Sequence, residues 1–279
     1  MKQKYKKIDI KTKRLVNSLF LWNYQAAFKG RWIEFSDFRE YTPSDDARHI
    51  DWLVSAREWK TIMRRYREER ELDILFVLDL SVSMEFGFGQ KKLDTLIEIL
   101  YLIAFSGIQN GDKVWALLIW KNHSKFTGFK KGNIWLFKIL SAVENFELKE
   151  PWDFLNFNSL NALPVKNSLV FVFTDSLSVD EKTLKLARIK NDLIYIRISD
   201  SFEETLEWKQ GILSLWDTKK KIVIDLDNKK KKQRYLDLRN KKKNKLTEIL
   251  MKNKISNLEI DEHTDIYKAF LSFMKSREL

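Results

Sequence analysis

One short stretch, residues 72–84, constrains the fold of this chain more than any other. It reads LDILFVLDLSVSM, and residues 74–78 within it form an unbroken apolar run. A run of this length without polar alternation is typical of a strand buried on both faces, as in a parallel sheet covered by helices. The sequence therefore predicts an α/β protein in which this strand is one of the most buried.

Three oxygen-bearing side chains follow the apolar run at alternate positions: Asp79, Ser81 and Ser83. Open α/β sheets place their ligand sites in loops at the carboxyl ends of the strands. Carboxylate and hydroxyl oxygens suit a hard cation such as Mg²⁺, which binds few carboxylates and keeps several waters. Asp and Ser also form ordinary turns by bonding their own backbone, so the spacing alone leaves a plain turn as the alternative.

The composition excludes several classes of protein. The 279 residues include no cysteine and only three histidines, which lie far apart in the sequence. Disulfides and thiolate metal sites are therefore excluded, a zinc enzyme is disfavoured, and a reducing, cytoplasmic location is expected. No apolar run approaches the roughly 18 residues that a membrane span requires. The net charge of +12 is concentrated in residues 2–13 and 219–254, which form either solvated faces or contacts with nucleic acid or anionic lipid.

Strand-like and helix-like segments alternate along the rest of the chain. We predict strands at residues 113–120, 169–173 and 193–198, and helices at residues 93–108, 134–146 and 182–190. A hairpin is expected at residues 212–224, then a long basic helix at 229–254, a short strand near 258–260 and a final helix at 265–275. This order predicts a doubly wound, mostly parallel sheet of the Rossmann type.

Residues 31–57 form the segment richest in charged and aromatic side chains. They surround a Pro-Ser-Asp turn, and neighbouring Arg and Asp can form bidentate pairs that fix a loop without regular strands. The residues concerned are Arg39, Tyr41, Pro43, Asp45, Asp46, Arg48, Asp51 and Trp52. We predict a structural clamp packed on the sheet domain, because ion-pair networks of this kind need no substrate. The chain then divides into an N-terminal extension, residues 1–70, and an α/β domain, residues 71–279.

Several of these motifs resemble, in the same order, the signature of the bacterial domain-of-unknown-function family 58. The matching stretches are residues 39–52, 55–57, 68–72 and 79–84. The resemblance implies a von Willebrand factor A-like fold and an association with MoxR-type AAA+ ATPases. It also implies a metal-ion-dependent adhesion site, with Asp79, Ser81 and Ser83 in its first loop and Asp175 in its third.

The second loop of that site departs from the family pattern. Relatives carry a threonine there, whereas this chain reads Trp152-Asp153-Phe154. Either Asp153 substitutes for the hydroxyl, or the site is incomplete. The expected ligand set is therefore Asp79, Ser81, Ser83, Asp175 and Asp153, which would bind Mg²⁺ weakly or not at all.

Three functions compete at this point. The first, which we favour, is a non-enzymatic protein-binding module, metal-dependent if the site is filled, that acts as an adaptor of a MoxR-type ATPase. The second is a metal-dependent hydrolase or phosphatase with Asp79 as nucleophile, but such enzymes need a general-acid Asp two residues later, where this chain has Ser81. The third is binding of nucleic acid or a membrane surface through residues 219–254, which lack closely spaced stacking aromatics.

Overall fold

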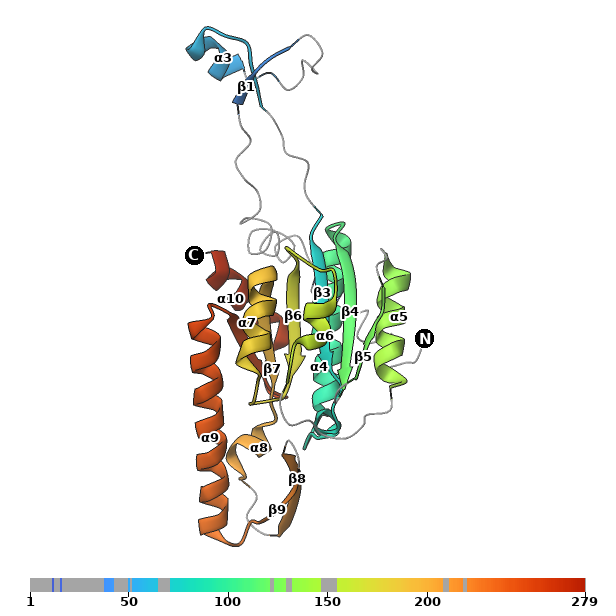
Figure 1. Ribbon diagram of the computed structural model, residues 1–279, viewed down its shortest axis with the longest axis vertical. Helices are drawn as coiled ribbons and strands as arrows, with labels where there is room; N and C mark the ends of the chain where they lie inside the picture. The colour runs from blue at the N-terminus through green and yellow to red at the C-terminus, as the bar shows by residue number, and fades with distance from the viewer. Residues whose placement is uncertain are drawn as a thin grey trace.

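A mostly parallel, six-stranded sheet forms the centre of the molecule (Figure 1). The computed structural model describes residues 12, 16, 38–42, 50, 52–64, 71–120, 123–128, 132–146, 155–207, 211–217 and 220–278. The strand order is β10-β7-β6-β3-β4-β5. The strands are β3 (Asp73–Asp79), β4 (Lys113–Trp120), β5 (His123–Phe126), β6 (Leu169–Thr174), β7 (Asp192–Ile198) and β10 (Ser256–Ile260). Every pairing is parallel except that of β4 with β5. The predicted doubly wound sheet is confirmed, and β3 lies in its interior.

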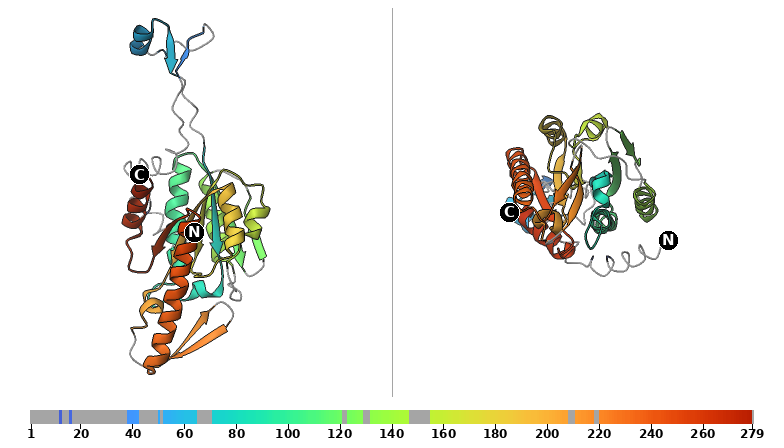
Figure 2. Two further views of the ribbon diagram at one scale, coloured as in Figure 1. Left: turned by 60° about the vertical axis from the view of Figure 1, so that its left-hand side comes forward. Right: turned by 90° about the horizontal axis from the view of Figure 1, so that it is seen from below.

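Helices cover both faces of this sheet, as Figure 2 shows from below. One face packs against α4 (Lys92–Gln109), α5 (Asn133–Glu144) and α10 (Ile266–Glu278). The other packs against α6 (Asn158–Ala162), α7 (Glu181–Lys190) and α9 (Lys229–Lys252). Successive residues of a strand point to opposite faces, so Phe76 and Leu78 enter the first core while Leu75 and Val77 enter the second. This double burial explains why the β3 sequence is apolar without alternation.

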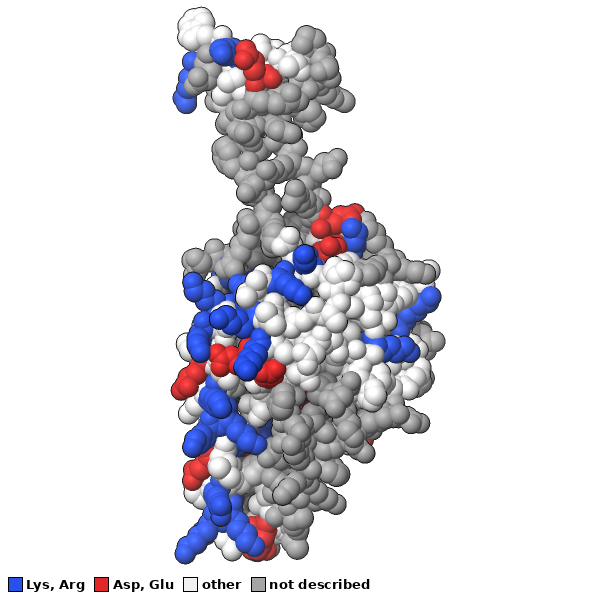
Figure 3. All heavy atoms as spheres, in the orientation of Figure 1, with Lys and Arg blue, Asp and Glu red and all other residues white. Residues whose placement is uncertain are grey.

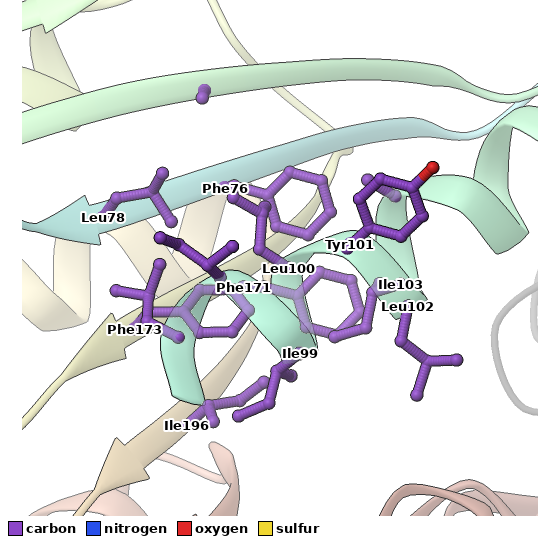
Figure 4. Packing of buried hydrophobic residues seen from close by; sticks show 14 of the residues in the cluster. Phe76, Leu78, Ile99, Leu100, Tyr101, Leu102, Ile103, Phe171, Phe173 and Ile196 are labelled. Atoms are coloured by element: carbon purple, nitrogen blue, oxygen red, sulfur yellow. The ribbon is translucent and has the colours of Figure 1, made fainter. Parts of the chain in front are cut away.

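Aromatic packing fixes β3 against β6 (Figure 4). The Phe76 ring stacks on Phe171 at a centroid distance of 5.6 Å and lies 5.9 Å from Phe173. Burying a phenylalanine side chain completely is worth roughly 1.5–3 kcal/mol. In the parallel register Leu78 is the partner of Phe173, so the next residues, Asp79 and Thr174, also lie side by side. The core thereby sets the geometry of the polar residues that follow both strands.

A small substructure extends beyond the carboxyl ends of the parallel strands (Figure 1). It consists of the 3₁₀ turn η3 (Val82–Glu85), the short helix α8 (Ser201–Thr205) and the antiparallel hairpin of β8 (Ile212–Asp217) and β9 (Lys220–Asp225). Phe202, Leu206, Ile224 and Leu226 form its buried core, with Phe86 and Tyr235 packed against them. The predicted hairpin is confirmed, and it lies next to η3, the turn that carries Ser83.

Only part of the N-terminal extension lies among the described residues. Of these, Val16 packs against the first core. In contrast, β1 (Phe38–Glu40), α3 (Trp52–Glu58) and β2 (Ile62–Arg64) lie away from the six-stranded sheet (Figure 1). The β1 and β2 strands pair with each other, so they satisfy their own backbone groups without the sheet domain. The clamp itself stays a prediction, because most of its residues lie outside the described part of the chain.

The residues assigned to the clamp are only partly described. Arg39 lies in β1 opposite Met63, and the Tyr41 amide donates to the Thr61 carbonyl at 2.8 Å. The side chain of Trp52 is 71% exposed. The remaining members, Pro43, Asp45, Asp46, Arg48 and Asp51, lie outside the described residues.

Candidate binding site at the carboxyl ends of β3 and β6

Asp79, the last residue of β3, has a buried carboxylate that accepts two hydrogen bonds. The residue is 2% exposed. The backbone amide of Ser81 donates to its Oδ1 at 3.0 Å, and the hydroxyl of Thr174 donates to its Oδ2 at 2.6 Å. Thr174 also accepts a hydrogen bond from the Ser176 amide at 3.0 Å. The carboxylate therefore joins the ends of two adjacent strands.

The two serines form a hydrogen-bonded chain that leads to Asp175. The hydroxyl oxygens of Ser81 and Ser83 lie 2.9 Å apart, and Ser83 Oγ donates to Asp175 Oδ1 at 3.0 Å. Because a serine hydroxyl has one proton, which Ser83 gives to Asp175, Ser81 is the donor in the Ser81–Ser83 pair. Ser81 is buried, whereas Ser83 and Asp175 are partly exposed. The chain thus runs from the interior to the edge of the sheet.

A lysine completes the coordination of Asp175. Lys92, the first residue of α4, is 1% exposed and donates to Asp175 Oδ2 at 2.6 Å. It also donates to the Glu203 carboxylate from α8, at 3.0 Å to Oε1 and 3.1 Å to Oε2. Arg239 from α9 reaches Glu203 Oε2 and Glu204 Oε1, both at 3.0 Å. Residues from α4, α8 and α9 therefore meet Asp175, which directly follows β6, in one charged network.

The two aspartates have opposite pKa shifts. Burial and the nearby charge of Asp175 raise the pKa of Asp79 to about 6, although hydrogen bonds from Thr174 and Ser81 act to lower it. Burial also acts to raise the pKa of Asp175, but the Lys92 ammonium and the Ser83 hydroxyl hold it below its usual value. Asp175 is therefore ionised throughout the physiological range, whereas Asp79 changes charge near pH 6.

The structure brings together four of the five residues predicted to form the site. Asp79, Ser81, Ser83 and Asp175 form one contiguous cluster, while Asp153 lies outside the described residues. The prediction missed Thr174, Lys92 and Glu203, which bond directly to the two aspartates or to each other. The burial of Lys92 could have been predicted from the sequence. Helical spacing places it on the same face of α4 as Thr95, Leu96 and Ile99, which are buried.

The cluster as arranged does not fit a resident divalent cation. Both oxygens of Asp79 and both oxygens of Asp175 already accept hydrogen bonds. A magnesium ion bound through Asp175 Oδ2 at its usual distance of about 2.1 Å would lie less than about 5 Å from the Lys92 ammonium. Within the described part of the chain, no group of three His, Cys, Asp or Glu side chains is arranged to hold a metal. Magnesium binding by the predicted ligand set stays a prediction.

The sequence matches the family described as "Protein of unknown function DUF58" over residues 37–245, which is most of the chain. The chain belongs to the DUF58 family. Similar curated proteins include "Uncharacterized protein Mb1516" of Mycobacterium bovis and "Uncharacterized protein Rv1480" of Mycobacterium tuberculosis. Each is 28% identical over 112 residues, which are 40% of this chain and 35% of the relative. The match therefore spans about a third of the length of these relatives.

Among solved structures, similar chains include two described as von Willebrand factor A domains. The "SpRpn10 VWA domain" is 12% identical with a TM-score of 0.39, covering 73% of this chain and 94% of that one. The "von Willebrand factor type A from Catenulispora acidiphila" is 10% identical with a TM-score of 0.39, covering 75% of this chain and 42% of that one. The fold described above rests on the strand order and not on these likenesses.

The basic helix α9 is partly engaged in ion pairs with the rest of the domain. Lys243 contacts Glu259 at 2.9 Å, Lys252 contacts Glu181 at 2.8 Å, and Arg239 belongs to the network around Glu203. On the face seen in Figure 3, acidic side chains lie among the basic ones along this side of the molecule. Of the helices that the structure describes, none is long and apolar enough to cross a bilayer.

Proposed function

We propose that this protein is a protein-binding module that presents the sheet edge around Ser83 and Asp175, and that its partner is a MoxR-type AAA+ ATPase or a client of one. The supporting observation is the closed hydrogen-bond chain from Ser81 through Ser83 to Asp175 and Lys92. A polar edge whose rotamers are fixed in advance loses little conformational entropy when a partner binds. The ATPase is suggested by the family resemblance.

The same network argues against the phosphatase alternative. A nucleophilic carboxylate must reach its substrate, yet Asp79 is 2% exposed and both of its oxygens accept internal hydrogen bonds. The position of the general acid holds Ser81, whose hydroxyl proton is directed to Ser83. These contacts give Asp79 a structural role in joining β3 to β6.

The partner is tested by direct binding between purified proteins. The full chain is titrated with the MoxR-type ATPase of the same organism, and affinity is measured by calorimetry in the presence and absence of ATP. Glu85, exposed at the end of η3, is changed to Lys, and Glu248, exposed on α9, is changed to Lys as a control of equal charge. We expect a loss of about tenfold or more for Glu85→Lys and no loss for Glu248→Lys, since reversing a charge disturbs electrostatic complementarity only where the partner binds.

Four results would contradict the proposal. Absence of binding in both nucleotide states would exclude this partner, and equal losses in both variants would exclude this edge. Hydrolysis of p-nitrophenyl phosphate that disappears in Asp79→Asn would favour the phosphatase instead. Binding to DNA or RNA that weakens steeply with salt would favour the basic helix.

A further inference from the structure

The ammonium of Lys92 occupies the centre of the charged network beside Asp175. It lies 2.6 Å from Asp175 Oδ2 and about 3 Å from both oxygens of Glu203, so its three donor positions face acceptors. It also lies 5.6 Å from the centre of the Phe86 ring. The Lys92 ammonium therefore binds and neutralises clustered carboxylate oxygens, as a bound metal ion would.

The neighbouring carboxylates favour the charged form of Lys92. Burial acts to lower the pKa of Lys92, but the carboxylates of Asp175 and Glu203 outweigh it and raise the pKa to about 12. A lysine is a compact point charge on a flexible stem, which suits it to the place of a small inorganic cation.

The position of Lys92 in its helix is unfavourable without these partners. It is the first residue of α4, where the amide dipoles present positive charge, and cations are disfavoured there. It is also 1% exposed, although a lysine is almost never fully buried unless it is paired. Both costs are offset only by the acceptors that surround Nζ, so the placement indicates a specific role in this cluster.

We propose that Lys92 is a built-in cation that takes the place of a divalent metal ion, so that the cluster of Ser81, Ser83 and Asp175 keeps its arrangement without metal. A divalent ion sharing Asp175 Oδ2 would lie close to a second positive charge in a buried region, where repulsion is strong. This inference concerns the charge of the site, and it stands whether or not the proposed ATPase binds there.

The role of Lys92 is tested by metal-dependent thermal stability of the full chain. Unfolding is followed in EDTA and in 10 mM MgCl₂ or MnCl₂ at matched ionic strength, for the parent, Lys92→Met and the double variant Lys92→Met/Asp175→Asn. The parent should melt within about 1 °C of the same temperature in all buffers. Lys92→Met should melt lower in EDTA and regain about 5 °C or more with metal, since a ligand at 100 times its Kd shifts Tm by that amount in a domain of this size. The double variant should show no gain.

Two controls keep the inference falsifiable. Lys92→Arg keeps the positive charge and should remain insensitive to metal, as the parent is. If Lys92→Met does not fold, titration of the parent with Mn²⁺, followed by electron paramagnetic resonance, decides the matter. Saturable binding by the parent that is lost in Ser83→Ala would overturn the proposal, and so would a metal-dependent rise in the Tm of the parent. Absence of saturable binding supports a site whose cation is Lys92.

Discussion

Replacing Thr174 by Val should weaken the junction between β3 and β6 by an amount that depends on pH. Valine keeps the shape of the buried side chain but removes the hydroxyl that donates to Asp79 Oδ2 at 2.6 Å and accepts from the Ser176 amide. A hydrogen bond to a charged group is worth about 1.5–3 kcal/mol and one between neutral groups about 0.5–1.5 kcal/mol. With the pKa of Asp79 at about 6, we expect a loss of roughly 3 kcal/mol at pH 8 and about half of that at pH 4.5.

Urea unfolding of the parent and of Thr174→Val at the two pH values measures this difference. Ser106→Ala is the matched control, because the buried hydroxyl of Ser106 donates to the backbone carbonyl of Leu102 at 2.7 Å, an acceptor that does not titrate. Its cost should be the same at both pH values. A Thr174→Val cost that is also independent of pH, or below about 1 kcal/mol at pH 8, would refute the idea that Thr174 stabilises an ionised Asp79.

Three further perturbations test other parts of the structure. Gly87→Ala would place its Cβ 2.0 Å from a backbone carbonyl oxygen and should cost about 1–3 kcal/mol in denaturant unfolding. Gly89→Ala should be neutral, because no described residue other than its chain neighbours lies within 4 Å of the added Cβ. Arg277→Met leaves the carboxylate of Asp192 without its partner at 2.5 Å and should cost roughly 3 kcal/mol, with a smaller loss for Arg277→Lys. The folded state raises the pKa of Asp79 from 3.8 to about 6, so its stabilising contribution is present below pH 3.8 and lost as pH rises through 6. Asp79→Asn should flatten the stability profile in that window, and an unchanged profile would contradict this assignment.

Periodicity predicted the sheet because each signal for it is local. The apolar run of β3 and the alternation of strands with helices reflect burial on two faces, which can be read within a few residues. The convergence of Asp79 with Asp175 was also predictable, since both follow strands whose carboxyl ends lie at one edge. The antiparallel β5 was not predicted, because its exposed residues HSKF have no apolar pattern.

The cation of the site could not be identified in the same way. Lys92 and Glu203 lie far apart in the chain, and only the packing of α8 against the sheet edge brings them together. The N-terminal signature stays a prediction, because most of its residues lie outside the described part of the chain. Trp52 and Trp59 are 71% and 93% exposed. An aromatic composition therefore does not by itself specify which side chains are covered.

The strand order also has a consequence for the time course of synthesis. The interior strand β3 is completed at residue 79, but its neighbour β6 begins only at residue 169. At the usual elongation rates, β6 emerges from the ribosome roughly 5–20 seconds after β3. During that interval one edge of β3, apolar on both faces, has no native partner, and unpaired apolar edges promote aggregation. Nascent chains that stop between β5 and β6 should therefore be the most aggregation-prone lengths of this protein.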